Sequence, residues 1–267
     1  MIIDNKTYDK RTYIMGILNA TPDSFSDGGK FNTLDAALYR AEQIVNEGGD
    51  IIDIGGESTR PGHTQISDSE EIERTAPIIE AISGCFDIPV SIDTYKSAVA
   101  EAALKAGAVM VNDIWGFKYD KKTAEVTAKY NAACCLMHNR DTTVYDNFVR
   151  DVANELSQSV DIALAAGVDK NQICIDPGVG FGKTYEQNLE IINKLERLNA
   201  LGYPVLLGTS RKSVIGLALG LPVEERLEGT IATSVMGVMK GCRFLRVHDV
   251  AANARAAAMT ERILERG

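Results

Sequence analysis

The stretch IIDIGGESTR at residues 51–60 decides the fold of this 267-residue chain. Its first four residues form a largely apolar run, and glycines and polar residues follow it directly. A short apolar run of this kind is typical of a strand that is buried on both faces, as in a parallel sheet covered by helices. The polar residues from Glu57 to Arg60 therefore lie at the point where such a strand ends.

The same arrangement recurs along the whole chain. Apolar runs cover residues 13–18, 51–54, 89–92, 109–111, 132–137, 173–175, 205–207 and 244–247. Apolar periodicity and glycine stops predict helices near residues 34–45, 70–82, 96–106, 123–130, 152–166, 186–201, 226–239 and 253–264. Eight strand–helix units predict an α/β fold, a (β/α)8 TIM barrel, more than the open doubly wound sheet that also alternates. Because the chain has the length of one barrel, we expect a single domain over residues 1–267.

Composition narrows the classes of function. A net charge of −9 argues against a general binder of nucleic acid or of anionic membranes. Residues 1–11 lack the apolar core of a signal peptide, and the apolar stretch 214–223 is too short to cross a bilayer. The five cysteines form no CxxC pair, so we expect reduced thiols and a cytoplasmic location.

Polar residues follow nearly every run, at the strand ends that form the active-site face of barrels. They are Asn19, Glu57, Arg60, Asp93, Asn112, His138, Asp176, Ser210, Arg211, Lys212, Arg246 and His248. Residues 19–31 and 55–68 are long connections rich in Gly, Pro, Ser, Thr and Asp, which suits loops over a site. Because these loops carry Phe25 and Arg60, we expect them to cover a substrate.

Two carboxylates and one amide indicate what such a substrate offers. Asp93 and Asp176 directly follow buried strands, where an unpaired carboxylate is costly, and Asn112 adds an amide. Together they match a heterocycle with a row of N–H donors, such as an aminopyrimidinone edge. A metal site and ion-paired scaffold residues are the alternatives. The three histidines, at positions 63, 138 and 248, have no zinc-ligand spacing of the HExxH kind.

Cationic residues indicate a phosphate group at the same face. Arg246 and His248 are two residues apart, so on a strand both side chains point the same way. Together with Arg60, Arg211 and Lys212 they suit phosphate oxygens. The glycine-rich segment 178–184 fails the phosphate-loop patterns, and we interpret it as a turn with Phe181 as an apolar wall. No serine–histidine–acid set can be assembled, so covalent catalysis is a minority hypothesis.

Taken together, these segments resemble the dihydropteroate synthases. The matching blocks are residues 15–29, 53–62, 91–96, 112–114, 176–184, 209–213, 226–230 and 246–250. The resemblance runs almost end to end and implies a TIM barrel. It also implies the condensation of 6-hydroxymethyl-7,8-dihydropterin diphosphate with 4-aminobenzoate to give 7,8-dihydropteroate and diphosphate, a step of folate biosynthesis.

The resemblance also implies roles for individual residues. The catalytic set would be Asp93, Lys212, Arg60, Arg246 and His248, with the first two also holding the pterin together with Asn112 and Asp176. Arg246, His248 and Arg60 would hold the diphosphate, and Asn19 would help to bind Mg2+. The aminobenzoate pocket would be shaped by Thr59, Pro61, Phe25, Phe181 and Ser210. Family members are usually homodimers and are the targets of sulfonamides.

Three other functions are open at this stage. A methyltetrahydrofolate:corrinoid methyltransferase would share the pterin-holding acids but has no need of the diphosphate residues. A catalytically idle paralogue should have lost some of the principal residues, and none is missing. A sugar-phosphate barrel enzyme explains the arginines but not the combination of Asp93, Asn112 and Asp176. The apolar segments 214–221 and 230–239 suit either a dimer interface or packing against the barrel.

Overall fold

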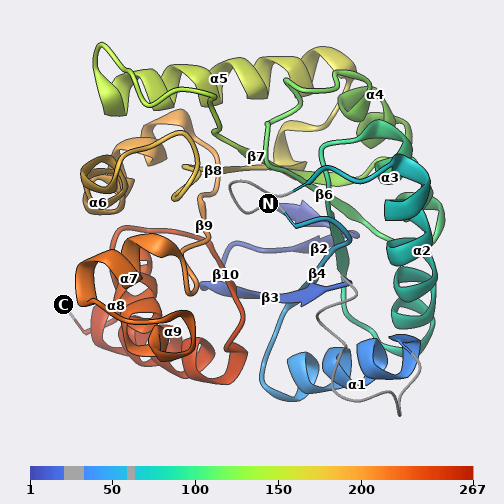
Figure 1. Cartoon of the computed structure of the whole chain (residues 1–267), viewed down its shortest axis with the longest axis horizontal. Coiled ribbons are helices and arrows are strands. Elements are labelled where there is room, and N and C mark those ends of the chain that lie inside the picture. Colours follow the sequence, from blue (N-terminus) through green and yellow to red (C-terminus); the bar gives the residue numbers. More distant parts are fainter. Residues whose placement is uncertain (21–32, 59–63, 267) are drawn as a thin grey trace.

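A computed structural model describes residues 1–20, 33–58 and 64–266 of the chain. Its main sheet has eight parallel strands in the order β8-β7-β6-β5-β4-β3-β10-β9. A parallel bridge between Ile175 and Val205 joins β8 to β9, the two ends of that order, so the sheet closes on itself. Helices form an outer ring around the strands (Figure 1). The predicted TIM barrel is confirmed.

The observed elements follow the predicted alternation. The parallel strands are β3 (Tyr13–Asn19), β4 (Ile51–Gly55), β5 (Val90–Asp93), β6 (Met110–Asp113), β7 (Ala133–Met137), β8 (Ile173–Asp176), β9 (Leu206–Leu207) and β10 (Phe244–Val247). The helices are α1 (Thr33–Asn46), α2 (Asp68–Cys85), α3 (Ser97–Lys105), α4 (Lys122–Lys129), α5 (Phe148–Ala166), α6 (Tyr185–Asn193), α7 (Ser213–Leu219), α8 (Leu227–Met239) and α9 (Val250–Leu264). Within the described ranges, no helix is both long and apolar enough to cross a membrane.

One predicted helix is wrong in part. The segment 186–201 is not continuous, because α6 ends at Asn193 and a 3-10 helix, Leu195–Leu201, follows it. Lys194 between them has φ −114° and ψ 23°, outside the helical region. In a 3-10 helix residues three apart lie on the same side, so Leu195 and Leu198 both reach the core and are fully buried.

A short hairpin precedes the barrel and was not predicted. It consists of β1 (Ile2–Ile3) and β2 (Lys6–Thr7), joined by Asp4 and Asn5, which both have positive φ. That backbone is the one that a two-residue hairpin turn requires. Ile3 is fully buried and packs with Tyr8 against the lower interior of the barrel.

The barrel interior is filled in layers. Since alternate strand residues point inward, one set of side chains forms a buried apolar layer near the strand starts. That layer contains Tyr13, Met15, Ile51, Met110, Ala133, Cys135, Cys174, Leu206 and Phe244. Two residues further along several strands, the inward positions become polar at Asp53, Asn112, Asp176 and Arg246. A dry lower core therefore supports a polar layer at the carboxyl ends of the strands.

Candidate active site

Four polar side chains from different strands converge in this upper layer. Asp93 lies directly beside Asn112 in the register of β5 and β6. Asp176 and Arg246 both flank Gly208, since a Cβ placed there would lie 3.6 Å from Asp176 Oδ2 and 3.8 Å from the Cβ of Arg246. Asp93, Asn112 and Asp176 are exposed by 8%, 5% and 4%. The structure thus brings the two predicted carboxylates and the predicted amide to one end of the barrel.

Arg246 donates hydrogen bonds to two carboxylates of this layer. Its Nη2 donates to Asp93 Oδ2 at 2.7 Å, and its Nε donates to Asp53 Oδ2 at 2.6 Å. Asp53 Oδ2 also accepts from Asn112 Nδ2 at 3.0 Å. A guanidinium shared between two carboxylates is a strong, orienting arrangement, because each N–H···O bond is charge-assisted. Arg246 is therefore held by two acids as well as being a predicted ligand of phosphate.

Burial shifts the pKa values of the ionisable groups here. Desolvation raises the pKa of Asp93 to about 7, although Arg246 opposes the shift, and desolvation also raises the pKa of Asp176. Desolvation lowers the pKa of Lys212 to about 8 against the attraction of Asp176. Burial alone would lower the pKa of Arg246, but Asp53 and Asp93 raise it above its ordinary value. The site thus holds groups that change charge near neutral pH, as active sites often do.

Lys212 connects the polar layer to the glycine-rich turn that follows β8. Its Nζ donates to the backbone oxygen of Val179 at 2.5 Å and lies 4.7 Å from the centre of the Phe181 ring. The turn itself is folded around Lys183, whose Nζ donates to the oxygens of Gly178 and Phe181, both at 3.0 Å. The predicted turn is present, and it places the Phe181 ring beside Lys212.

His138 supports the same turn from the end of β7. Lys183 Nζ also donates to His138 Nδ1, at 2.9 Å. Burial lowers the pKa of His138 to about 2 and the pKa of Lys183 to about 7. The imidazole is therefore neutral, and its Nδ1 is an acceptor because an ammonium can only donate. Sequence reasoning noted His138 at a strand end but gave it no role.

The remaining predicted cations divide into two groups. His248 lies beside Ser210, with its Nδ1 3.0 Å from the serine Oγ. Arg211 pairs instead with Asp249, through Nε at 2.9 Å and Nη2 at 2.6 Å. The structure thus associates His248 with the predicted substrate residue Ser210, whereas the guanidinium of Arg211 is engaged by a carboxylate outside the polar layer.

A second buried network, which was not predicted, lies behind the site. Lys96 Nζ donates to Glu57 Oε2 at 2.6 Å, to Glu71 Oε2 at 2.8 Å and to the oxygen of Ile66 at 2.8 Å. Glu57 Oε1 in turn accepts from the hydroxyl of Tyr95 at 2.6 Å. One ammonium, from the segment between β5 and α3, thus ties residues 57 and 66 of the predicted second loop to Glu71 on α2.

Asn19, at the end of β3, is the predicted ligand of Mg2+. Asn19 is the last residue of β3, and its backbone pairs with Gly55. Among the described residues no group of three or more His, Cys, Asp or Glu side chains could hold a metal ion. Mg2+ commonly binds through few protein oxygens together with waters and substrate phosphates. One amide oxygen therefore fits such an ion better than a resident metal centre.

Four predicted site residues lie outside the described part of the chain. These are Phe25, Thr59, Arg60 and Pro61.

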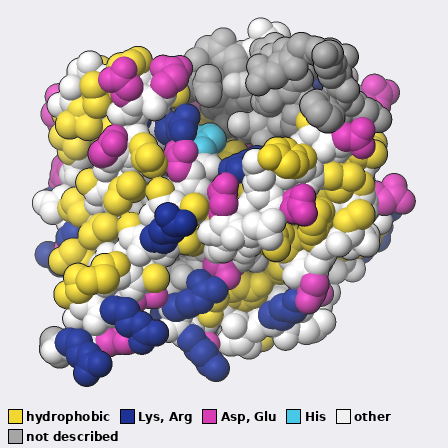
Figure 2. Space-filling view, turned by 90° about the horizontal axis from the view of Figure 1, so that it is seen from below, with side chains coloured by type: hydrophobic (Ala, Val, Ile, Leu, Met, Phe, Trp, Pro, Cys, Tyr) yellow, Lys and Arg dark blue, Asp and Glu magenta, His cyan; other side chains and the backbone are white. Residues whose placement is uncertain are grey.

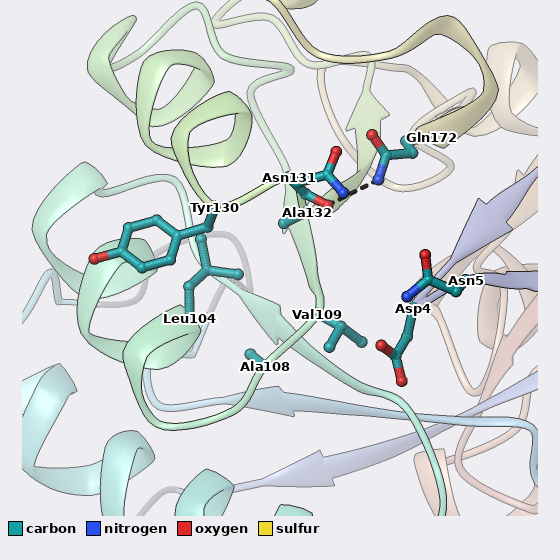
Figure 3. Close-up of a pocket in the computed structure, with 9 residues that line it drawn as sticks. All are labelled: Asp4, Asn5, Leu104, Ala108, Val109, Tyr130, Asn131, Ala132 and Gln172. Atoms are coloured by element: carbon teal, nitrogen blue, oxygen red, sulfur yellow. Dashed lines mark hydrogen bonds between the residues drawn. The ribbon is translucent and has the colours of Figure 1, made fainter.

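A separate cleft of about 240 Å3 lies at the opposite end of the barrel (Figure 3). It is lined by Asp4, Asn5, Leu104, Ala108, Val109, Tyr130, Asn131, Ala132 and Gln172. Several of these residues come just before β6, β7 and β8, at the strand starts. The amide of Gln172 donates to the oxygen of Asn131 at 2.8 Å. Barrel enzymes act at the carboxyl ends of their strands, so the polar layer is the better candidate.

Comparisons with known proteins all point to one family. A family described as pterin binding enzymes matches residues 15–248. A dihydropteroate synthase of Clostridium beijerinckii is 62% identical over 269 aligned residues, covering 100% of both chains. A crystal structure of dihydropteroate synthase from Clostridium difficile, in the presence of pteroic acid, has a TM-score of 0.93 and 55% identity, covering 96% of this chain and 98% of the other. The Xanthomonas albilineans enzyme with 4-aminobenzoic acid has a TM-score of 0.91 and 41% identity, covering 95% and 93%.

Proposed function

The chain belongs to the dihydropteroate synthase family, and we propose that its polar layer holds the pterin while neighbouring cations hold the diphosphate. The enzyme is a transferase that makes 7,8-dihydropteroate from 6-hydroxymethyl-7,8-dihydropterin diphosphate and 4-aminobenzoate. The observation that carries the residue assignment is the meeting of Asp93, Asn112 and Asp176 beside Lys212 and Arg246. These relatives are named as dihydropteroate synthases, and not as corrinoid methyltransferases or sugar-phosphate enzymes.

The pterin lies against the acceptors of the polar layer. Its aminopyrimidinone edge offers N–H donors, which ionised Asp93 and Asp176 and the Asn112 amide oxygen accept. Lys212 donates to an acceptor of the ring. Because these groups are almost completely buried, a ligand that leaves one of them unpaired binds far more weakly. This gives the site its selectivity for pterins.

The diphosphate lies towards His248 and Arg246; Arg60 would also bind it, and Asn19 would help to hold Mg2+. Mg2+ supplies neutralisation of the charge on the leaving group when it is bound. His248 can reach the diphosphate because it directly follows β10 and lies beside Ser210. Asp53 and Asp93 hold Arg246 in place, so its guanidinium does not have to be ordered when substrate arrives.

Phe181 and Ser210 belong to the proposed aminobenzoate pocket, and Phe25, Thr59 and Pro61 would complete it. The Phe181 ring contacts the Lys212 ammonium, and Ser210 lies two residues before Lys212 in the sequence. Sulfonamides, which mimic 4-aminobenzoate, compete for this pocket. Uncharged at neutral pH, the aromatic amine attacks the methylene carbon of the pterin without a strong general base. The carbon–oxygen bond breaks as the carbon–nitrogen bond forms, diphosphate leaves, and the amine gives its extra proton to solvent.

Diphosphate release tests the proposed function directly. We expect release from 6-hydroxymethyl-7,8-dihydropterin diphosphate to require both 4-aminobenzoate and Mg2+, and to equal the 7,8-dihydropteroate formed. The measurement is a coupled diphosphate assay with each component omitted in turn. Release that needs neither component contradicts the assignment. A chain that binds the pterin but releases nothing under any condition is the catalytically idle paralogue.

Affinity for the pterin should pass through a maximum between about pH 7 and pH 8. Ionised Asp93 accepts one N–H from Arg246 and a second from the pterin, and protonation removes the second. Binding therefore weakens by up to about tenfold per pH unit as the pH falls below the Asp93 pKa of about 7. Lys212 loses its charge above its pKa of about 8, so binding also weakens on the alkaline side. Isothermal titration with 6-hydroxymethyl-7,8-dihydropterin from pH 5.5 to 9.5 measures both limbs without the titration of the diphosphate. Asp93→Asn should remove the acidic limb, and an acidic limb that persists in this variant refutes the assignment to Asp93.

A homodimer in the cytoplasm completes the proposal. Large apolar side chains on the C-terminal helices are exposed, with Leu217 at 67%, Met239 at 62% and Ile263 at 60%. Hydrophobic side chains gather over this side of the molecule (Figure 2, left half). Such patches often mark contacts between subunits. The five free thiols, four of them buried, support a reducing compartment. Sedimentation equilibrium measures the state of assembly.

A further inference from the structure

We propose that Asp53, which lies below the substrate-binding face, is a positioning residue that sets which atoms Asn112 presents to the pterin and Arg246 presents to the diphosphate. The proposal rests on the proposed function and deepens it. It assigns a role in pterin recognition to a side chain that has no access to the ligand itself.

Asp53 lies inside the barrel wall. It is the third residue of β4, its exposure is 0%, and its register partners are Ile17 on β3 and Ser91 on β5. Gly55, two residues further along β4, is the residue that pairs with Asp93. Asp53 is therefore one inward position deeper than the predicted pterin ligand, and its effect on substrate has to pass through its neighbours.

The first neighbour is the Asn112 amide. An asparagine side chain has a donating and an accepting end, so on its own it would recognise either a donor or an acceptor. A carboxylate accepts only, and Asp53 Oδ2 lies 3.0 Å from Asn112 Nδ2. The amide nitrogen must then face Asp53, and the amide oxygen faces away from it. Asn112 becomes an acceptor, like Asp93 and Asp176, which matches the donor-rich edge of a pterin.

The second neighbour is the Arg246 guanidinium. Its Nε donates to the same Asp53 oxygen, while its Nη2 donates to Asp93. Two bonds to acids on different strands fix both the position and the plane of a guanidinium. They leave Nη1 outside both bonds and able to donate to a ligand. The bond to Asp53 also keeps Arg246 from pairing with Asp93 alone, so Asp93 Oδ1 remains an acceptor for substrate.

Folding stability alone does not account for Asp53. Its other oxygen, Oδ1, is buried with no hydrogen-bond partner within the described residues, and the same holds for Ser91 Oγ beside it. A buried acid paired with arginine is often no more stabilising than an apolar pair of the same shape, and an unpaired buried oxygen is costly. A role in orienting Asn112 and Arg246 explains why a carboxylate is buried at this position.

The variant Asp53→Asn tests this role, because it keeps the size of the side chain and removes the charge. We expect affinity for 6-hydroxymethyl-7,8-dihydropterin to fall about 10- to 100-fold, the range for loss of a charged hydrogen bond. The KM for 4-aminobenzoate at saturating pterin diphosphate should change less than about threefold. Ser91→Ala is the matched control, since it removes an unpaired buried oxygen from the same layer, and it should bind pterin as the wild type does.

A pH profile separates positioning from a general structural defect. The groups that face Asp93 are Arg246 from β10, Asp53 from β4, Glu71 from α2 and Lys212 from the segment after β9. Asp53→Asn removes one repelling charge and frees Arg246 for Asp93, so the acidic limb of pterin affinity should move to lower pH. An unshifted limb together with wild-type affinity overturns the proposal, and so does an equal loss in Asp53→Asn and Ser91→Ala.

If Asp53→Asn does not fold, nuclear magnetic resonance of the wild-type enzyme still decides. The side-chain NH2 signals of Asn112, identified by their absence in Asn112→Leu, should be protected from exchange with solvent before the pterin is added, because Asp53 already accepts from the amide nitrogen. Protection that arises only on binding would mean that the amide donates to the ligand, which contradicts the proposal. A wild-type enzyme that does not bind the pterin would instead refute the proposed function.

Discussion

Replacing Arg246 by methionine should lower the free energy of unfolding by about 3–5 kcal/mol at pH 8, because it leaves two buried carboxylates without their shared cation. Asp53 and Asp93 both bond to this guanidinium, and their side chains are exposed by 0% and 8%. The same change should reduce kcat/KM for the pterin diphosphate by about 10²–10³-fold, the usual effect of removing one charged stabilising group. Urea denaturation and steady-state kinetics measure the two effects.

The stability loss in Arg246→Met should depend on pH in a defined direction. The pKa of Asp93 is already raised to about 7 by burial, and loss of the cation raises it further. A carboxyl group with a raised native-state pKa destabilises the fold above the pKa of the unfolded chain, about 4, and does so most fully above its native-state pKa. The deficit should therefore be largest at pH 8 and shrink towards pH 5.

A matched substitution on the surface controls for the change of side chain. Arg262 on α9 pairs with Glu265, and its side chain is 79% exposed. Arg262→Met should cost less than about 1 kcal/mol, with no dependence on pH between 5 and 8 and unchanged kinetics. A stability loss in Arg246→Met that does not vary with pH would show that the guanidinium does not stabilise the fold by neutralising Asp53 and Asp93.

The barrel could be predicted because the information for it is local. Each strand is a short apolar run, each helix has its own periodicity, and each predictive feature lies within about fifteen residues. The predicted meeting of Asp93, Asn112 and Asp176 followed from the same pattern, because each ends or nearly ends a strand of one barrel. The break at Lys194 could not be predicted from periodicity, since Leu195 and Leu198 suit an α-helix or a 3-10 helix equally.

The supporting contacts could not be predicted because they depend on register and on distant segments. Asp53 is one polar residue in an apolar run, and only the pairing of β4 with its neighbours places it below Asp93. Lys96 meets Glu57 and Glu71 across 39 and 25 residues of sequence. The signal for Asp53 was nonetheless present, since a carboxylate within the run at residues 51–54 requires a buried partner.

Replacing Gly178 by alanine should damage both stability and activity, whereas the same change at two other glycines should leave activity normal. Gly178 has φ +69°, and a Cβ there would lie 1.9 Å from the backbone oxygen of His138. The left-handed backbone costs an L-residue about 1–2 kcal/mol, and overpacking adds about 1–3 kcal/mol. We expect the free energy of unfolding to fall by about 2–5 kcal/mol in urea denaturation.

Activity should fall in Gly178→Ala because the turn cannot move without disturbing the pterin site. The N–H of Gly178 donates to Asp176 Oδ1 at 2.7 Å, and the N–H of His138 donates to the backbone oxygen of Asp176 at 2.9 Å. Moving either backbone to make room for the methyl group therefore displaces Asp176 or removes one of its donors. A shift of this kind should lower kcat/KM for the pterin diphosphate by about 10²-fold.

Two control glycines separate the causes of the effect. Gly202 has φ +76° with no atom within 4 Å of the place that a methyl group would take, so Gly202→Ala should show the backbone cost alone, about 1–2 kcal/mol, with normal kinetics. Gly84 lies within α2 with open space around it, so Gly84→Ala should stabilise the fold by about 0.5–1 kcal/mol. If Gly178→Ala lost no more stability than Gly202→Ala and kept its kcat/KM, the contact with His138 would not constrain the turn. That outcome would mean that the turn does not position Asp176.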